Sequence, residues 1–335
     1  MLLRNAGLVV GKIGLRRGLA LNCSADWRGE LGVLPQKVTV VECGPRDGLQ
    51  NEKMILPTRI KAELVNRLQG AGCQIVEATS FVKAAAVPQM ADAAELFEQI
   101  EKPAHVRLPC LVPNMQGLEK ALALGVREIS VFAAASTSFS KSNINCTREE
   151  SYDRYSPVIA LARERGLRVR GYISTVLGCP FEGRVRPEQV AEVVYKFYRM
   201  GCDEISLGDT IGVGTPGSTR ELLLALRDVV PVERLGVHFH DTWGQALPNI
   251  LTSLLHGVSI VDSSVAGLGG CPYAPAATGN VATEDVLFML HGLGIETGID
   301  LDKMCQVGDW ISHYLGKHSR SRVALAKSRS HSHLF

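Results

Sequence analysis

Residues 37–48 read KVTVVECGPRDG, and this stretch separates two α/β architectures. It begins with a short apolar, β-branched run, which predicts a strand buried on both faces. A doubly wound sheet normally follows its first strand with a phosphate-binding loop. Here the strand ends in Gly44–Gly48 with Arg46 and Asp47. Polar residues directly after a buried parallel strand favour a barrel instead.

The strand-like run over 37–43 is the first of a series that repeats along the chain. Eight strand-like runs, each followed by a segment with helical spacing, are typical of a (β/α)8 TIM barrel. The expected strands are 37–43, 73–79, 106–112, 128–133, 168–174, 204–207, 235–240 and 259–265. The expected helices are 58–69, 88–100, 115–124, 147–164, 187–200, 219–229, 245–255 and 283–290, with an additional C-terminal helix at 301–314 outside the barrel. We predict a TIM-barrel catalytic domain over residues 37–315 and a mobile basic tail over 316–335.

The two ends of the chain differ in charge from its middle. Residues 1–25 carry four Lys/Arg and the segment from Lys317 carries five, with no acid in either, so the middle holds an excess of about seven acidic charges. Such a body has no general affinity for nucleic acid, and no apolar run approaches the roughly 20 residues of a membrane span. The composition of residues 1–25 predicts a mitochondrial transit peptide and hence the matrix; a disordered leader is the alternative. Nine single cysteines without a C-x-x-C pair indicate reduced thiols in an intracellular compartment.

A metal site is predicted where the first and seventh strands end. His238 and His240 are two apart, so both imidazoles point to one face of a strand and can converge on one ion. With Asp47 they suit Mg²⁺ or Mn²⁺, and could also hold Zn²⁺. The alternatives are hydrogen-bonded core histidines and, for Asp47, a turn residue. Arg46 would balance an anionic oxygen or join a surface ion pair, and Asn280 would offer the metal a neutral oxygen or serve only as a turn residue.

Other unusual residues fall at the same end of the predicted barrel. Glu77 and Asp209 could orient other groups, contact substrate or carry protons. Cys271 follows a glycine run, 267–270, and could act as an acid or base over the site; a buried, inert thiol is the alternative. Residues 212–217 match G-x-G-x-x-G, but they follow the sixth strand without the acidic partner of a dinucleotide site. We expect a barrel loop whose backbone amides face substrate.

Several segments resemble the 3-hydroxy-3-methylglutaryl-CoA lyase family. They are 41–52 (VECGPRDGLQNE), 77–81 (EATSF), 178–180 (GCP), 206–210 (SLGDT), 238–242 (HFHDT) and 267–285. The resemblance runs over about residues 37–311. The Arg-Asp pair and the H-x-H strand are shared with the related isopropylmalate, homocitrate and citramalate synthases and with pyruvate carboxylase. The GLGGCPYA run with Cys271 is more specific to the lyases.

The resemblance implies a role for each matching residue. The implied metal ligands are Asp47, His238, His240 and Asn280; the implied catalytic residues are Cys271, Arg46, His238, Asp47 and Glu77; and the implied substrate contacts are Arg46, Gln50, Ser206 and Asp209. Arg46 would neutralise the thioester oxygen, and Cys271 would be a general acid/base. His238 or Asp47 would accept the proton of the C3 hydroxyl.

The implied activity is metal-assisted retro-Claisen cleavage of (S)-3-hydroxy-3-methylglutaryl-CoA to acetyl-CoA and acetoacetate. Mg²⁺ or Mn²⁺ would be the cofactor, the acyl-CoA the small-molecule partner, and ketone body synthesis and leucine degradation the setting. We also expect a homodimer. The alternatives are a condensing synthase of the same superfamily and a non-catalytic barrel that acts as a binding protein.

Overall fold

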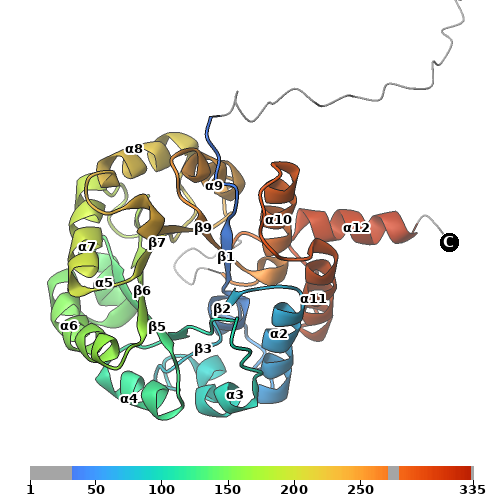
Figure 1. Cartoon of the computed structure of the whole chain (residues 1–335), viewed down its shortest axis with the longest axis horizontal. Helices are drawn as coiled ribbons and strands as arrows, with labels where there is room; N and C mark the ends of the chain where they lie inside the picture. Colours follow the sequence, from blue (N-terminus) through green and yellow to red (C-terminus); the bar gives the residue numbers. More distant parts are fainter. Residues whose placement is uncertain (1–31, 271–278, 333–335) are drawn as a thin grey trace, which may run out of the picture.

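Parallel strands form an inner ring that is surrounded by helices (Figure 1). The computed structural model describes residues 32–270 and 279–332. The predicted transit peptide over residues 1–25 and the predicted catalytic residue Cys271 lie outside the described residues. No helix among the described residues is long and apolar enough to cross a membrane.

The sheet closes on itself, so the predicted TIM barrel is confirmed. Its strands are β1 Thr39–Glu42, β2 Ile75–Val76, β3 Thr79–Ser80, β4 Cys110–Leu111, β5 Glu128–Ala134, β6 Arg168–Ser174, β7 Glu204–Asp209, β8 Leu235–Phe239 and β9 Ile260–Ser263. The order is β2-β1-β9-β8-β7-β6-β5-β4-β3, with every neighbouring pair parallel. The single strand predicted over 73–79 is divided into β2 and β3. The amide of Glu77, between them, donates to the Glu42 carbonyl in β1 (2.9 Å), and the amide of Ala78 donates to the Pro109 carbonyl, next to β4 (3.0 Å). The segment that contains β2 and β3 therefore bonds to strands on both of its sides and closes the barrel.

The outer layer contains more helices than the sequence indicated. The α-helices are α2 Thr58–Gly70, α3 Ala93–Gln99, α4 Met115–Ala123, α5 Thr137–Ile144, α6 Arg148–Glu164, α7 Pro187–Met200, α8 Pro216–Leu226, α9 Ala246–Leu255, α10 Thr283–Gly292, α11 Leu301–Tyr314 and α12 Arg322–Ser332. Short helical turns are η1 Gly44–Gly48, η2 Pro88–Met90, η3 Val232–Arg234 and η4 Val265–Gly267. Helix α5 was not predicted, because its polar sequence has no clear apolar face.

Helix α7 shows how the sequence builds this layer. Pro187 lies in the first turn, where the missing N–H has no helical partner to lose. Val190, Val194 and Phe197 recur at helical spacing and are fully buried against the barrel. Gly201 ends the helix with φ 108°, a left-handed conformation that suits glycine.

Arg322–Ser332, within the segment predicted to be a mobile basic tail over 316–335, form α12 beside α10 and α11 (Figure 1). This helix was not predicted from the sequence, and the mobility of the tail stays a prediction. The carboxylate of Asp285, in α10, accepts hydrogen bonds from the amides of Arg322 (3.1 Å) and Val323 (2.9 Å) at the start of α12. The Ser321 hydroxyl donates to the same carboxylate (2.6 Å), and Ala324 is buried. The basic, serine-rich sequence gives no local signal for the start of this helix, because the residue that caps its first turn, Asp285, lies more than thirty positions earlier.

Candidate active site

The three predicted metal ligands lie together at the carboxyl ends of the strands. Asp47 is in η1, directly after β1, while His238 is in β8 and His240 follows that strand. One candidate ligand atom from each residue can be chosen so that all three lie within 4.8 Å of one another. Nε2 of His238 is 3.7 Å from Oδ2 of Asp47, and the two imidazole centroids are 5.6 Å apart. The two-residue spacing therefore places both imidazoles on the same side of the strand, next to Asp47, as predicted.

The protonation states of Asp47 and His240 fit a metal ion. Burial alone would raise the pKa of Asp47, but Arg46 and the two histidines outweigh it and lower that pKa to about 2. Burial, together with the charge of His238, lowers the pKa of His240 to about 4, so its imidazole is neutral at pH 7. Nδ1 of His240 is buried and has no hydrogen-bond partner within the described ranges. An ionised carboxylate and a neutral imidazole with an unused nitrogen are donors of the type a divalent ion requires.

Asn280 lies beside this group because its backbone forms an isolated bridge with His240. Its Nδ2 donates to Oδ2 of Asp47 (2.6 Å) and to the carbonyl of Leu268 (3.3 Å). The amide nitrogen, rather than the oxygen, therefore faces the aspartate. Metal ligation through Oδ1 would require this amide group to turn over, a change that exchanges the oxygen and nitrogen positions without moving the backbone.

Arg46 is buried between two carboxylates. Its Nη1 donates to Oδ1 of Asp47 (2.8 Å), and its Nε donates to Oε2 of Glu77 (2.8 Å). The guanidinium carbon is also 5.4 Å from the ring centroid of Tyr172, which places a cation near an aromatic ring. Glu77 thus fixes the arginine, and the arginine brings positive charge to the edge of the proposed metal group.

The three remaining predicted substrate contacts, Gln50, Ser206 and Asp209, differ in which group they bond to. Gln50 donates from Nε2 to Oδ1 of Asp47 (2.7 Å), so it belongs to the same group. The hydroxyl of Ser206 is fully buried and donates to Oδ2 of Asp262 (2.8 Å). Asp209 accepts from the amide of Gly214 through Oδ2 (2.8 Å), and burial raises its pKa to about 6.

That contact corrects the expectation for residues 212–217. The Gly214 amide points to a carboxylate of the barrel rather than to substrate. A side chain at Gly214 would lie 2.3 Å from Cδ1 of Leu177 and 2.8 Å from Oδ2 of Asp209, so the glycine allows this close approach. Gly214, the second glycine of the G-x-G-x-x-G match, is therefore explained by its packing against Asp209.

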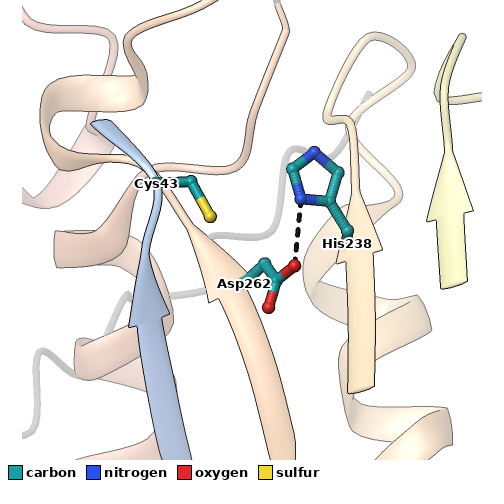
Figure 2. A group of neighbouring side chains, drawn as sticks. All are labelled: Cys43, His238 and Asp262. Carbon is teal, nitrogen blue, oxygen red and sulfur yellow. Dashed lines mark hydrogen bonds and ion pairs between the residues drawn. The ribbon is translucent and has the colours of Figure 1, made fainter. Parts of the chain in front are cut away.

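A buried charged network that was not predicted from the sequence lies beneath the site. Asp262 is the register partner of His238 across β8 and β9, and its Oδ2 is 3.2 Å from Nδ1 of that histidine (Figure 2). Oδ1 of Asp262 accepts from Nη2 of Arg170 (2.6 Å), whose Nε is 2.6 Å from Oε1 of Glu204. A histidine whose Nδ1–H donates to a carboxylate presents its Nε2 lone pair, here toward Asp47. The sequence feature that could have indicated this network is a charged residue inside each of two apolar runs, Arg170 in 168–174 and Asp262 in 259–265.

A second group of possible ligands consists of Cys43, His238 and Asp262 (Figure 2). Burial raises the pKa of the Cys43 thiol well above its usual range, which disfavours the thiolate that a metal binds. Asp262 already accepts from Arg170 and Ser206. The group of Asp47, His238 and His240 is therefore the better candidate for a metal site.

Two buried carboxylates hold the turn that leads into the glycine run. Oε1 of Glu42 accepts from the amide of Val265 (2.9 Å), and both oxygens of Glu284 lie 3.0 Å from the amide nitrogen of Ala266. The hydroxyl of Thr283 donates to Oε2 of Glu42 (2.6 Å). These contacts fix η4 from the interior of the barrel.

These carboxylates predict a pH-dependent stability. Burial raises the pKa of Glu42 to about 7 and that of Glu284 to about 8, from an ordinary 4.5, so the native state binds protons that the unfolded chain releases. This stabilisation is complete below pH 4.5 and is lost as the pH rises through 8. We expect Glu284→Gln to flatten the fall in the free energy of unfolding over that range, measured by urea denaturation in EDTA. Glu63→Gln, at an exposed ion pair, is the control, and an unchanged slope in Glu284→Gln would contradict the assignment.

Together, the fold and the site define a TIM-barrel enzyme with a group suited to a divalent metal ion. The HMGL-like family model matches residues 37–311. The chain is 56% identical over 296 residues to "Hydroxymethylglutaryl-CoA lyase, mitochondrial" of Arabidopsis thaliana, covering 88% of this chain and 63% of that one. It is 54% identical over 296 residues to the Rattus norvegicus protein of the same name, covering 88% and 91%. The crystal structure of hydroxymethylglutaryl-CoA lyase from Pseudomonas aeruginosa superposes with a TM-score of 0.87 at 54% identity, covering 89% of this chain and 99% of that one.

The chain belongs to the HMGL-like family of hydroxymethylglutaryl-CoA lyases. The resemblance predicted from the sequence motifs is confirmed, and so is its extent over residues 37–311. The chain spans less than two thirds of the Arabidopsis relative but nine tenths of the rat one.

Proposed function

We propose that the protein cleaves (S)-3-hydroxy-3-methylglutaryl-CoA to acetyl-CoA and acetoacetate. The observation that carries this proposal is the group of Asp47, His238 and His240 with Arg46 beside it, in a chain whose relatives bear the name of that lyase. Mg²⁺ or Mn²⁺ is the proposed cofactor, held by these three residues and Asn280. Such an ion would act as a Lewis acid that lowers the pKa of the substrate hydroxyl.

The residues around the ion would have separate tasks. Arg46, fixed by Glu77, would neutralise the thioester oxygen as negative charge develops on it. Gln50 would keep the Asp47 carboxylate in place, and Asp209, with its raised pKa, would contact the substrate. Cys271 directly follows Gly270 in the sequence and would protonate the enolate carbon to release acetyl-CoA.

The pKa shifts favour His238 over Asp47 as the base for the C3 hydroxyl. The Asp47 carboxylate, with a pKa of about 2, holds a proton poorly. Burial opposes protonation of His238, but its hydrogen bond to Asp262 and the charge of Asp47 raise its pKa. Because Asp262 holds Nδ1, proton acceptance and metal ligation at Nε2 would have to alternate.

The proposed setting is the mitochondrial matrix, with residues 1–25 as the transit peptide. Two relatives named above are mitochondrial, although a rat relative that is 54% identical is named "3-hydroxy-3-methylglutaryl-CoA lyase, cytoplasmic". A homodimer is the proposed assembly. The proposed small-molecule partner is the acyl-CoA.

The decisive experiment measures acetoacetate released from 3-hydroxy-3-methylglutaryl-CoA, with and without EDTA. We expect turnover that EDTA abolishes and added Mn²⁺ or Mg²⁺ restores. Cys271→Ser should bind Mn²⁺ as the wild type does in isothermal titration, yet lose most turnover. Condensation of acetyl-CoA with a keto acid, without cleavage, would instead identify a synthase. Failure to bind Mn²⁺ would favour a non-catalytic barrel.

A further inference from the structure

The segment between α11 and α12 contacts the glycine run that precedes Cys271. The backbone amide of Arg320 donates to the carbonyl of Ala266 (2.9 Å), and its Nη1 donates to the carbonyl of Gly269 (2.8 Å). A side chain at Gly267 would lie 3.0 Å from Cβ of Arg320, so the two segments pack closely. One residue from outside the barrel therefore spans the turn from Ala266 to Gly269.

This turn has a backbone that needs such support. Ala266 has φ 57°, a left-handed conformation that is unfavourable for a non-glycine residue. Gly269 has φ 122°, which only glycine adopts readily. Glu42 and Glu284 hold the inner side of the turn, and the side chain of Asn51 donates to the carbonyl of Gly270 (2.9 Å). Arg320 holds its outer side.

The same turn is in contact with the proposed metal group. Asn280 donates to the carbonyl of Leu268 at 3.3 Å and to Asp47 at 2.6 Å. A side chain at Gly269 would lie 2.7 Å from Nδ2 of Asn280, so the Gly269 backbone forms the wall against which this amide packs. A shift of Gly269 would therefore move or release the Asn280 side chain.

We propose that Arg320 is a positioning residue, which holds Gly269 in place and through it orients Asn280 toward the metal group. The catalytic part of this inference rests on the proposed lyase function. Arg320 is itself exposed, although Ser319 and Ser321 on either side of it are buried, so its contact with Gly269 adds little to global stability. Its effect is on the geometry of the site, where small displacements are costly.

Three variants test this role: Arg320→Ala, Arg320→Lys and Arg322→Ala. The last is a matched control, because it removes a cation two residues away, at the start of α12, whose guanidinium has no hydrogen bond or ion pair in the described part of the chain. Amide hydrogen exchange of a peptide covering residues 264–270, Mn²⁺ affinity and steady-state kinetics are measured for each variant, together with thermal unfolding.

We expect faster exchange in Arg320→Ala, a weaker Mn²⁺ affinity and a kcat reduced about tenfold, with KM and the unfolding temperature nearly unchanged. Arg320→Lys should recover part of each loss, and Arg322→Ala should match the wild type. Unchanged exchange in Arg320→Ala would overturn the proposal, as would faster exchange with unaltered Mn²⁺ affinity and turnover. If the wild type does not cleave the substrate, the proposed function fails, while exchange and Mn²⁺ affinity still decide the role of Arg320.

Discussion

Replacing Arg46 with Gln is expected to lower kcat for cleavage by about 10²- to 10³-fold. Arg46 is the buried cation that contacts Asp47, and it is fixed by Glu77, so its charge is already in place when negative charge develops on the thioester oxygen. The shorter, neutral amide of Gln cannot supply that charge. Arg46→Lys should be intermediate, because it keeps the charge but cannot reproduce contacts to both carboxylates.

The main complication is that Arg46→Gln leaves the fully buried Glu77 without its cation, which destabilises the protein. The double variant Arg46→Gln/Glu77→Gln removes that unpaired charge and should recover stability without recovering turnover. Arg59→Gln, at an exposed position in α2, is the control for the loss of a positive charge. The proposed role would be wrong if the double variant had near wild-type kcat.

Features that depend on local spacing could be predicted from the sequence. The two-residue spacing of His238 and His240 predicts convergence of the imidazoles, and the position of Asp47 after a buried strand predicts its place at the same end of the barrel. The alternation of strand-like and helix-like segments was sufficient to predict the barrel fold. Boundaries were less accurate where one strand was divided, as in β2 and β3.

Features that depend on which strands become neighbours could not be predicted in the same way. Arg170 and Asp262 are 92 residues apart and meet only because β6 through β9 pair in one parallel register. The start of α12 depends on Asp285, in another helix. The role of Gly214 in the turn at 212–217 is to donate its amide to Asp209, and no spacing rule predicts that hydrogen bond. For Arg170 and for the start of α12 the missing information was a long-range contact, whereas Asp209 is five residues from Gly214 and the missing information was the direction of its side chain.

The second large effect is expected from the interior network, through Arg170→Met. Arg170 is 1% exposed and pairs with two buried carboxylates, those of Asp262 and Glu204. Removing the cation leaves both carboxylates uncompensated, at a cost of about 3–5 kcal/mol in the free energy of unfolding. Turnover should fall as well, because Asp262 loses the contact that holds it against Nδ1 of His238.

Urea denaturation and steady-state kinetics would separate the two consequences. Arg168→Met is the matched control, since it lies two residues earlier in β6 with a side chain that is 47% exposed, and it should cost less than about 1 kcal/mol. The triple variant Arg170→Met/Glu204→Gln/Asp262→Asn removes all three charges and should regain much of the lost stability. It should not regain turnover, because an amide at 262 no longer favours the His238 tautomer that presents Nε2 to the site. If the triple variant recovered both, the network would serve the fold alone, and the link from Asp262 to His238 would have no part in catalysis.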